Sequence, residues 1–175
     1  MAVALVSILA EDHVGLIAEI ADHLFDAGIN LRDTSCAVLG TGAEFTAVCE
    51  LPDGLTVEAL EQGLLRLPTL EAAQVRVVPY RFDPWPDETG KVTHRVTISG
   101  GDQLGLVARL SHVFAQNEAN IVRLEARKLP DSEGGLYVTR FAVWIPPGRA
   151  RLCLATVANT AGSLGLTSHV EESAL

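Results

Sequence analysis

Apolar residues recur along the chain at two spacings, one typical of strands and one typical of helices. Residues 3–9 are rich in Val, Leu and Ile and run into the polar residues Glu11, Asp12 and His13. This pattern predicts a well-buried strand that ends in a loop. From Gly15 the apolar spacing changes to three and four residues, which predicts an amphipathic helix that ends at Gly28. The expected apolar stripe of this helix consists of Leu16, Ile17, Ile20, Leu24 and Phe25.

A turn at residues 40–42, which contains two glycines, separates two further strand patterns. The second strand alternates with period two, and its apolar positions are Phe45, Ala47, Cys49 and Leu51. Thr56 is placed to cap a following helix, with Leu55 and Leu60 as a hydrophobic staple. Residues 75–80 then form a last strand. The order β-α-β-β-α-β predicts an antiparallel sheet with two helices on one face.

The chain repeats this pattern once. The segment that begins at Asp12 and ends at Asn30 returns 90 residues later, with Asp, Gly, Leu, Ala and Asn in register. A long period that occurs only twice predicts a duplicated small domain. The corresponding elements are expected as strands at 92–99, 121–128 and 136–145, helices from Gly105 and over 148–161, and a turn at 130–135.

We therefore expect an α+β protein with one domain at residues 1–81, a linker at 82–91 that contains two prolines, and a second domain at 92–175. Because domains of this size bury a small fraction of their surface, we also expect the two copies to share an interface.

Composition and charge narrow the function classes. Hydrophobic residues make up 48% of the chain, yet no apolar run is long enough to span a bilayer, and the start lacks the basic region of a signal peptide. We expect a cytoplasmic protein. The net charge of −9 disfavours direct binding of nucleic acid. The basic residues Arg123, Arg127 and Lys128 could contact an anion, but we favour a solvated strand edge.

The three cysteines, Cys36, Cys49 and Cys153, are odd in number and widely spaced, with apolar neighbours. This pattern predicts buried free thiols in a reducing compartment. None of the five histidines has metal-type spacing with Cys or carboxylates, and the glycines match neither the P-loop nor the dinucleotide fingerprint. We expect no catalysis, no cofactor and no metal.

The repeated loop joins a strand to a helix N-terminus, whose free N–H groups and dipole suit a carboxylate. Gly15 and Gly105 would let a ligand or a neighbouring backbone approach closely, although tight packing of helix on strand would need glycine equally. Asp12 and Asp102 could accept from a ligand ammonium group or cap their own helices.

Asn30 and Asn120 each begin a strand and carry an amide that donates and accepts. Asn30 follows Gly28 closely, so it could simply belong to the turn that stops the helix. Asn120 has no adjacent glycine, which favours a side-chain role common to both copies.

The combination of Asp-x-x-Gly-Leu, a helix, and Asn entering a strand resembles the ACT domain, a small regulatory module that binds amino acids. Two copies without an attached enzyme resemble the glycine cleavage system transcriptional repressor family, including residues 37–40 and 44–46 of the first hairpin. The resemblance implies two ferredoxin-like ACT-type domains that hold a small amino acid between domains. Its carboxylate would lie on the loop backbone, and an asparagine would reach it from an adjoining domain. The implied ligand-binding residues are Asp12, His13, Val14, Gly15, Leu16, Asn30, Asp102, Gln103, Leu104, Gly105, Leu106 and Asn120.

The family often has proline before the loop glycine, where this chain has Val14 and Leu104. The resemblance further implies a protein partner such as a transcription factor, and it leaves a homodimer open. The alternative function is a structural interaction module that kept the fold and lost the ligand, using its edge strands to pair with another sheet.

Overall fold

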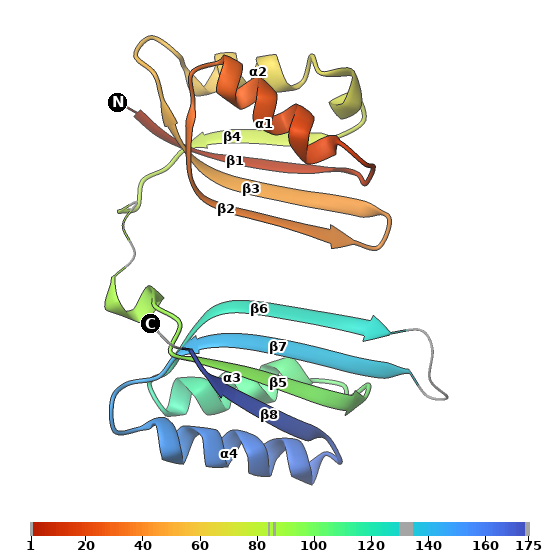
Figure 1. The fold of residues 1–175 in the computed structure, drawn as a ribbon, viewed down its shortest axis with the longest axis vertical. Coiled ribbons are helices and arrows are strands. Elements are labelled where there is room, and N and C mark those ends of the chain that lie inside the picture. The colour runs from red at the N-terminus through yellow and green to blue at the C-terminus, as the bar shows by residue number, and fades with distance from the viewer. Residues whose placement is uncertain (1, 84, 86, 130–134, 174–175) are drawn as a thin grey trace. The chain divides into compact units, whose positions relative to one another are not determined.

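The structure is a computed structural model that describes residues 2–83, 85, 87–129 and 135–173. It divides into two compact units, Met1–Pro84 and Trp85–Leu175 (Figure 1). The predicted turn at residues 130–135 lies outside the described residues except for Gly135.

Both units have the predicted order of elements. The first consists of β1 (Ala2–Glu11), α1 (Leu16–Asp26), β2 (Asn30–Leu39), β3 (Gly42–Leu51), α2 (Val57–Leu64), a 3-10 turn (Pro68–Leu70) and β4 (Gln74–Pro79). The second consists of a 3-10 turn (Glu88–Gly90), β5 (His94–Gly101), α3 (Leu106–Gln116), β6 (Asn120–Leu129), β7 (Leu136–Trp144), α4 (Ala150–Ser163) and β8 (Thr167–Glu172). The boundaries differ from the predicted ones by at most three residues.

Each unit contains one antiparallel sheet of four strands. The strand orders are β2-β3-β1-β4 and β6-β7-β5-β8, so the first strand of each unit is central and the second lies at an edge. Both helices of a unit cover the same face of its sheet, and the other face, which we call the open face, carries no helix of that unit among the described residues (Figure 1). The predicted fold class, two ferredoxin-like domains, is confirmed.

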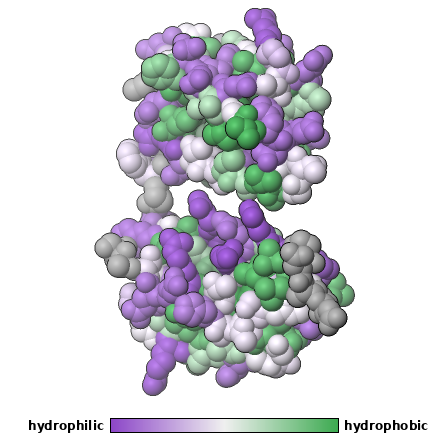
Figure 2. Space-filling model, turned by 45° about the vertical axis from the view of Figure 1, so that its right-hand side comes forward, coloured by the Kyte–Doolittle hydropathy of each residue, from purple (hydrophilic) through white to green (hydrophobic). Residues whose placement is uncertain are grey.

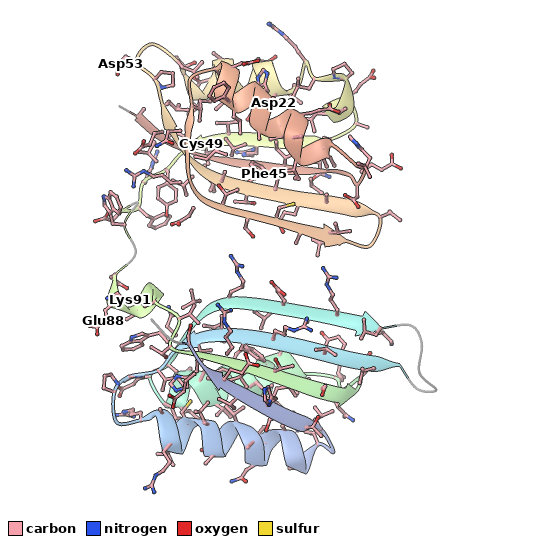
Figure 3. All side chains as sticks on the ribbon, in the orientation of Figure 1. Asp22, Phe45, Cys49, Asp53, Glu88 and Lys91 are labelled. Atoms are coloured by element: carbon pink, nitrogen blue, oxygen red, sulfur yellow. The ribbon has the colours of Figure 1, made fainter. Side chains whose placement is uncertain are left out.

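Strand β1 shows why one face is covered. Its inner side carries Ala4, Val6, Ile8 and Ala10, which are at most 7% exposed, whereas Leu9 on the open side is 43% exposed. The prediction of a well-buried strand therefore holds for alternate residues only. In β3 the predicted face is confirmed, because all four of its apolar residues are buried. Figure 3 labels two of them, Phe45 and Cys49.

The buried apolar stripes of the helices are narrower than the spacing of apolar residues in the sequence predicts. In α1, Leu16, Ile20 and Leu24 are buried, but Ile17 is 38% and Phe25 is 78% exposed. Those two residues were wrongly expected in the buried face. Helix α4 buries the small side chains Cys153, Val157 and Ala161 at every fourth position. In α2, Thr56 is the N-cap, and its Oγ1 accepts from the backbone N–H of Ala59 at 3.2 Å, as predicted.

The turn that ends α1 is repeated at the end of α3. The backbone N–H of Ile29 donates to the carbonyl of Leu24, and Gly28 has a φ of +73°. In the second unit the N–H of Ala119 donates to Phe114, and Glu118 takes the left-handed position with a φ of +57°. This is the Schellman motif in both cases. We predicted that the helix-ending turn before Asn30 has no counterpart before Asn120. This prediction was wrong, because Glu118 forms the same turn without a glycine.

The edge strands β2 and β6 each contain one bulge near the start. The pairing of β2 with β3 shifts between Leu31 and Thr34, and the pairing of β6 with β7 shifts between Ile121 and Arg123. A bulge adds one residue to one strand of a pair and so reverses which later residues face the helices. Beyond the bulge, Arg123 and the residues at alternate positions after it therefore face the open side of β6.

The surface of each unit mixes polar and apolar residues (Figure 2). Cys36 belongs to this surface, because it lies exposed on the edge strand β2, so its predicted burial was wrong. Cys49 and Cys153 are buried as expected, and all three thiols are free. Burial raises the pKa of the Cys49 thiol to about 11 and also raises the pKa of Cys153.

These environments predict the order in which the thiols react. In the native protein at neutral pH a disulfide reagent such as DTNB should modify Cys36 alone, because the reactive species is the exposed thiolate. All three cysteines should react in denaturant, and the Cys36→Ser variant should show almost no fast reaction. Rapid modification of a second thiol in the native state would contradict this assignment.

Candidate ligand-binding loops

The loop between β1 and α1 is a tight turn that ends at the helix. The backbone N–H of Leu16 donates to the carbonyl of His13 at 3.2 Å, and Gly15 has φ +100° and ψ −14°. These angles are those of the third position of a type II turn, which requires a positive φ. The loop is also anchored at its start, since the N–H of Asp12 donates to the carbonyl of Thr41 at 2.9 Å.

The second unit has the same turn. The N–H of Leu106 donates to the carbonyl of Gln103 at 3.2 Å, and Gly105 has φ +78° and ψ 10°. Neither α1 nor α3 has a side-chain cap at its N-terminus. The N–H groups of Leu16 and Leu106 donate within the turns, and the other first-turn N–H groups of both helices have no capping side chain to accept from them.

Backbone conformation, and not close packing, explains both loop glycines. A Cβ placed on Gly105 would meet no atom within 4 Å, and one placed on Gly15 would meet only Glu19, at 4.0 Å. Tight packing of helix on strand is therefore excluded as the reason for glycine. The space beside both turns is open, and the side chains of Val14 and Leu104 at the turns are 104% and 100% exposed.

The two loop aspartates do not cap their helices, because the N-cap positions belong to Gly15 and Gly105. Asp102 instead accepts from the ammonium of Lys128 on β6, with 3.1 Å between Oδ2 and Nζ. The first unit has Val38 at the position that corresponds to Lys128, so this ion pair exists in the second copy only. The Lys128 side chain was predicted to be solvated, but its ammonium group takes part in this ion pair.

Asn30 and Asn120 occupy the same place in their units but donate to different acceptors. The Asn30 amide donates to Glu50 Oε2 at 2.8 Å, and Arg32 donates to the other oxygen of Glu50 at 2.6 Å. The Asn120 amide donates to the backbone carbonyl of Thr89 at 2.9 Å. Within the units, Asn30 and Asn120 therefore do not share the side-chain role that we expected.

Each asparagine lies at the far end of its sheet from the loop of the same unit. Asn30 pairs with Glu50, which pairs with Val3, whereas the loop follows Glu11 at the other end of β1. Eight residue steps along a strand correspond to about 27 Å. A ligand on one loop can meet such an asparagine only from another domain.

The remaining predicted loop residues separate into two groups. The side chains of Leu16 and Leu106 are 2% and 3% exposed and belong to the cores, so only their backbone could contact a ligand. Those of His13 and Gln103 are exposed on the turns. No sequence motif marks Lys128 as a neighbour of Asp102, since only the place of β6 in the sheet brings the two side chains together.

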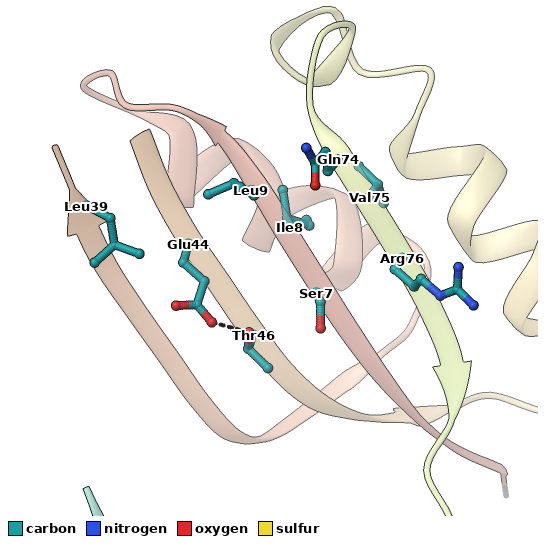
Figure 4. Close-up of a pocket in the computed structure, with 9 residues that line it drawn as sticks. All are labelled: Ser7, Ile8, Leu9, Leu39, Glu44, Thr46, Gln74, Val75 and Arg76. Carbon is teal, nitrogen blue, oxygen red and sulfur yellow. Dashed lines mark hydrogen bonds between the residues drawn. The ribbon is translucent and has the colours of Figure 1, made fainter. Parts of the chain in front are cut away.

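A separate shallow hollow of about 550 Å³ lies on the open face of the first sheet, and the loop glycine is not among the residues that line it (Figure 4). Thr46 Oγ1 donates to Glu44 Oε1 at 3.1 Å within it, and Ser7 lies between Thr46 and Arg76 in the strand pairing. The hollow is lined by Ser7, Ile8, Leu9, Leu39, Glu44, Thr46, Gln74, Val75 and Arg76.

Among the described residues, no group of three or more His, Cys, Asp and Glu side chains could hold a metal ion. No helix within the described ranges has the length and apolar character needed to cross a membrane.

Comparisons with known proteins show a similarity of fold and nothing more specific. No protein-family model matches the chain, and no curated protein matches it either. An unknown protein from Galdieria sulphuraria is similar over 99% of both chains, with a TM-score of 0.76 and 21% identity. A candidate glycine cleavage system transcriptional repressor is similar over 99% of this chain and 98% of that chain, with a TM-score of 0.68 and 15% identity.

The fold is that of a tandem ACT-type protein. Within this fold the two loops share their backbone conformation and differ in the side chains around them.

The turn geometry predicts that proline is accepted at both loops. Val14 and Leu104 occupy the second position of a type II turn, which favours proline, and their N–H groups donate no backbone hydrogen bond in the part of the chain that the structure describes. Val14→Pro and Leu104→Pro should each raise the free energy of unfolding by about 0.4 to 1 kcal/mol, measured by urea denaturation. Alanine at either position is the control and should change little. A clear loss of stability would contradict the assigned turn.

The Glu50 cluster gives a pH-dependent prediction. The hydrogen bond from Asn30, followed by that from Arg32, lowers the pKa of Glu50 below its ordinary value of 4.5. Because the folded pKa is depressed, the stabilisation is present above the ordinary pKa and is lost as the pH falls through the folded value. Asn30→Ala should raise the Glu50 pKa toward 4.5 in an NMR titration of the carboxyl carbon. Asn120→Ala should leave it unchanged, and an unaltered pKa in Asn30→Ala would exclude this role of the amide.

Proposed function

We propose that this chain is a non-catalytic regulatory protein that binds a small amino acid at interfaces between ACT-type domains. Occupation of these sites changes its affinity for a protein partner, such as a transcription factor. The ligand carboxylate lies on the N-terminal turn of α1 or α3, beside Gly15 or Gly105.

One observation carries the proposal: the same open type II turn precedes an uncapped helix in both units. Free N–H groups at a helix N-terminus together with the helix dipole favour an anion. Open space beside both glycines leaves room for a carboxylate to approach the backbone. The similarity of the fold to a candidate transcriptional repressor agrees with a regulatory role.

The ammonium group of the ligand needs an acceptor near the same turn. Asp12 supports this role in the first unit, since its carboxylate does not cap the helix. An asparagine from an adjoining domain completes the site, because Asn30 lies too far from the loop of its own unit. The edge strands β2 and β6 offer unpaired backbone groups through which two domains could align.

Weak affinity suits this function. A sensor of a metabolite pool needs dissociation constants from micromolar to millimolar, which correspond to about −8 to −4 kcal/mol. A few charge-assisted hydrogen bonds at a helix end can supply that much.

The second candidate function is a ligand-free interaction module. The ion pair between Lys128 and Asp102 favours it for the second unit, because the cation occupies the carboxylate that would otherwise accept from a ligand. Under this alternative, partner binding is independent of amino acids and is unchanged by Asn30→Ala with Asn120→Ala.

Isothermal titration calorimetry of the native protein against the common amino acids tests the proposal. At least one amino acid should bind, and the double variant Val14→Glu with Leu104→Glu should weaken binding by about tenfold or more, because a carboxylate at each turn repels that of the ligand. Both replaced side chains are fully exposed, so the fold should persist.

The matched control is Phe25→Glu with Leu152→Glu, which adds the same charge at exposed helix positions far from the turns. This control should bind as the native protein does. Folded protein that responds to no amino acid would refute the sensing function and leave the interaction module. Equal losses in both double variants would mean that net charge, and not the turns, governs binding.

A further inference from the structure

The two halves of the chain differ sharply in charge. Residues 1–84 contain thirteen acidic and four basic residues, so they carry the whole net charge of −9. Residues 85–175 contain nine of each and are neutral. The basic residues of the second half are therefore the principal cations that the protein can offer to an acidic partner.

Four of these cations gather on the open face of the second sheet. In the strand pairing, Arg123 on β6 lies opposite Ala142 on β7, which lies opposite Arg95 on β5. The adjacent row on this face contains Arg140, and the next row contains Arg127. The intervening residues Phe141 and Val143 of β7 are buried beneath the helices, so these arginines face away from them.

All four arginines are exposed, and none has a side-chain hydrogen bond or an ion pair within the described ranges. Figure 3 shows nitrogen-tipped side chains that stand off β6 on the side away from the helices. Lys128, the next residue along β6, faces the opposite side and pairs with Asp102. The arginine face and the ligand loop are thus separate surfaces.

Two carboxylates share the open face with the arginines. Glu125 lies opposite Arg140 and Glu171 lies opposite Arg95 in the strand pairing, but neither carboxylate forms an ion pair with its arginine among the described residues. Glu171 instead contacts His169, with 3.2 Å between Oε1 and Nε2. Four guanidinium groups against two carboxylates leave an excess of positive charge. Opposite charges on paired strands balance Arg95 and Arg140 in part, whereas Arg123 and Arg127 lie opposite the uncharged residues Ala142 and Val138.

We propose that this arginine face binds an acidic, extended segment of the protein partner. The inference rests on the proposed function only in assuming that a partner exists. Along an extended chain, alternate side chains project to one side about 6.7 Å apart. The rows that contain Arg123, Arg140 and Arg127 have that same spacing, because each row lies two residues along the strand from the next. A segment with acidic residues at alternate positions would therefore place one carboxylate at each row.

A discrete acidic segment fits better than nucleic acid. A long polyanion would extend beyond the four arginines, and the net charge of −9 on the chain disfavours the binding of phosphate. Carboxylates also match guanidinium groups in bidentate geometry, which supports specific docking on a flat sheet.

Fluorescence anisotropy of the full chain tests the proposal with a labelled octapeptide of alternating Glu and Thr. We expect saturable binding at about 20 mM salt that weakens markedly at about 200 mM, where screening is strong. The double variant Arg123→Gln with Arg140→Gln should lose about tenfold in affinity. The single variant Arg127→Gln should lose about threefold.

The matched control is Arg109→Gln with Arg151→Gln, which removes the same charge from the exposed sides of α3 and α4 in the same unit. This control should bind the peptide like the native chain, and an alternating Lys and Thr peptide should not bind. The loop variant Val14→Glu with Leu104→Glu should also keep peptide binding, so failure of amino-acid sensing and failure of this proposal are distinguishable.

Three results would overturn the proposal. The first is the absence of peptide binding by folded native protein, with the fold verified by circular dichroism. The second is an equal loss in the face variant and the helix control. The third is binding of a ten-nucleotide oligouridylate that is tighter than peptide binding and sensitive to the same arginines, which would identify a nucleic-acid surface.

Discussion

Alternate burial along the central strands is the constraint on which each unit depends. Strand β1 pairs with β3 on one side and β4 on the other, and β5 holds the same position in the second unit. Their inner residues, such as Val6 and Val96, are completely buried under the helices. Loss of a large inner side chain leaves a cavity in a close-packed core and costs about 2 to 5 kcal/mol. The loops and edge strands that carry candidate function are positioned by this arrangement.

The sequence predicts the fold well because its signals are local. Period-two and helical spacings, the Thr56 cap and the repeat of 90 residues lead to the observed order of elements. The Schellman turn at Glu118 was not predicted, because the usual sign of such a turn is a glycine and here a glutamate takes the left-handed conformation. Phe25 and Cys36 were predicted to be buried and are exposed. The spacing of apolar residues identifies one face of a helix or strand, but it does not show how much of that face neighbouring elements cover.

The backbone conformation of the candidate loops could be predicted from the sequence, but the contacts of the side chains around them could not. Gly15 and Gly105 mark turns that a sequence motif can reveal, because the required φ restricts the residue type. The ion pair of Asp102 with Lys128 and the separate acceptors of the two asparagines depend on strand pairing over distances that no motif encodes. Duplication thus preserved the shape of the loop while the neighbouring side chains diverged.

The bulge near the start of β6 affects how this strand can change in evolution. It inserts one residue between Ile121 and Arg123, and all later positions of β6 face the side opposite to the one that simple alternation from Ile121 would give. Regular pairing of all the same residues would therefore turn the rest of the strand over, bringing Arg123 and Arg127 beneath the helices and exposing Leu124 on the open side. Deletion of Val122 would instead remove the bulge and leave every later residue on its present face, because Ile121 would then be followed directly by Arg123 opposite Ala142. Homologous chains are accordingly expected to vary at this point both in residue type and by one residue in length.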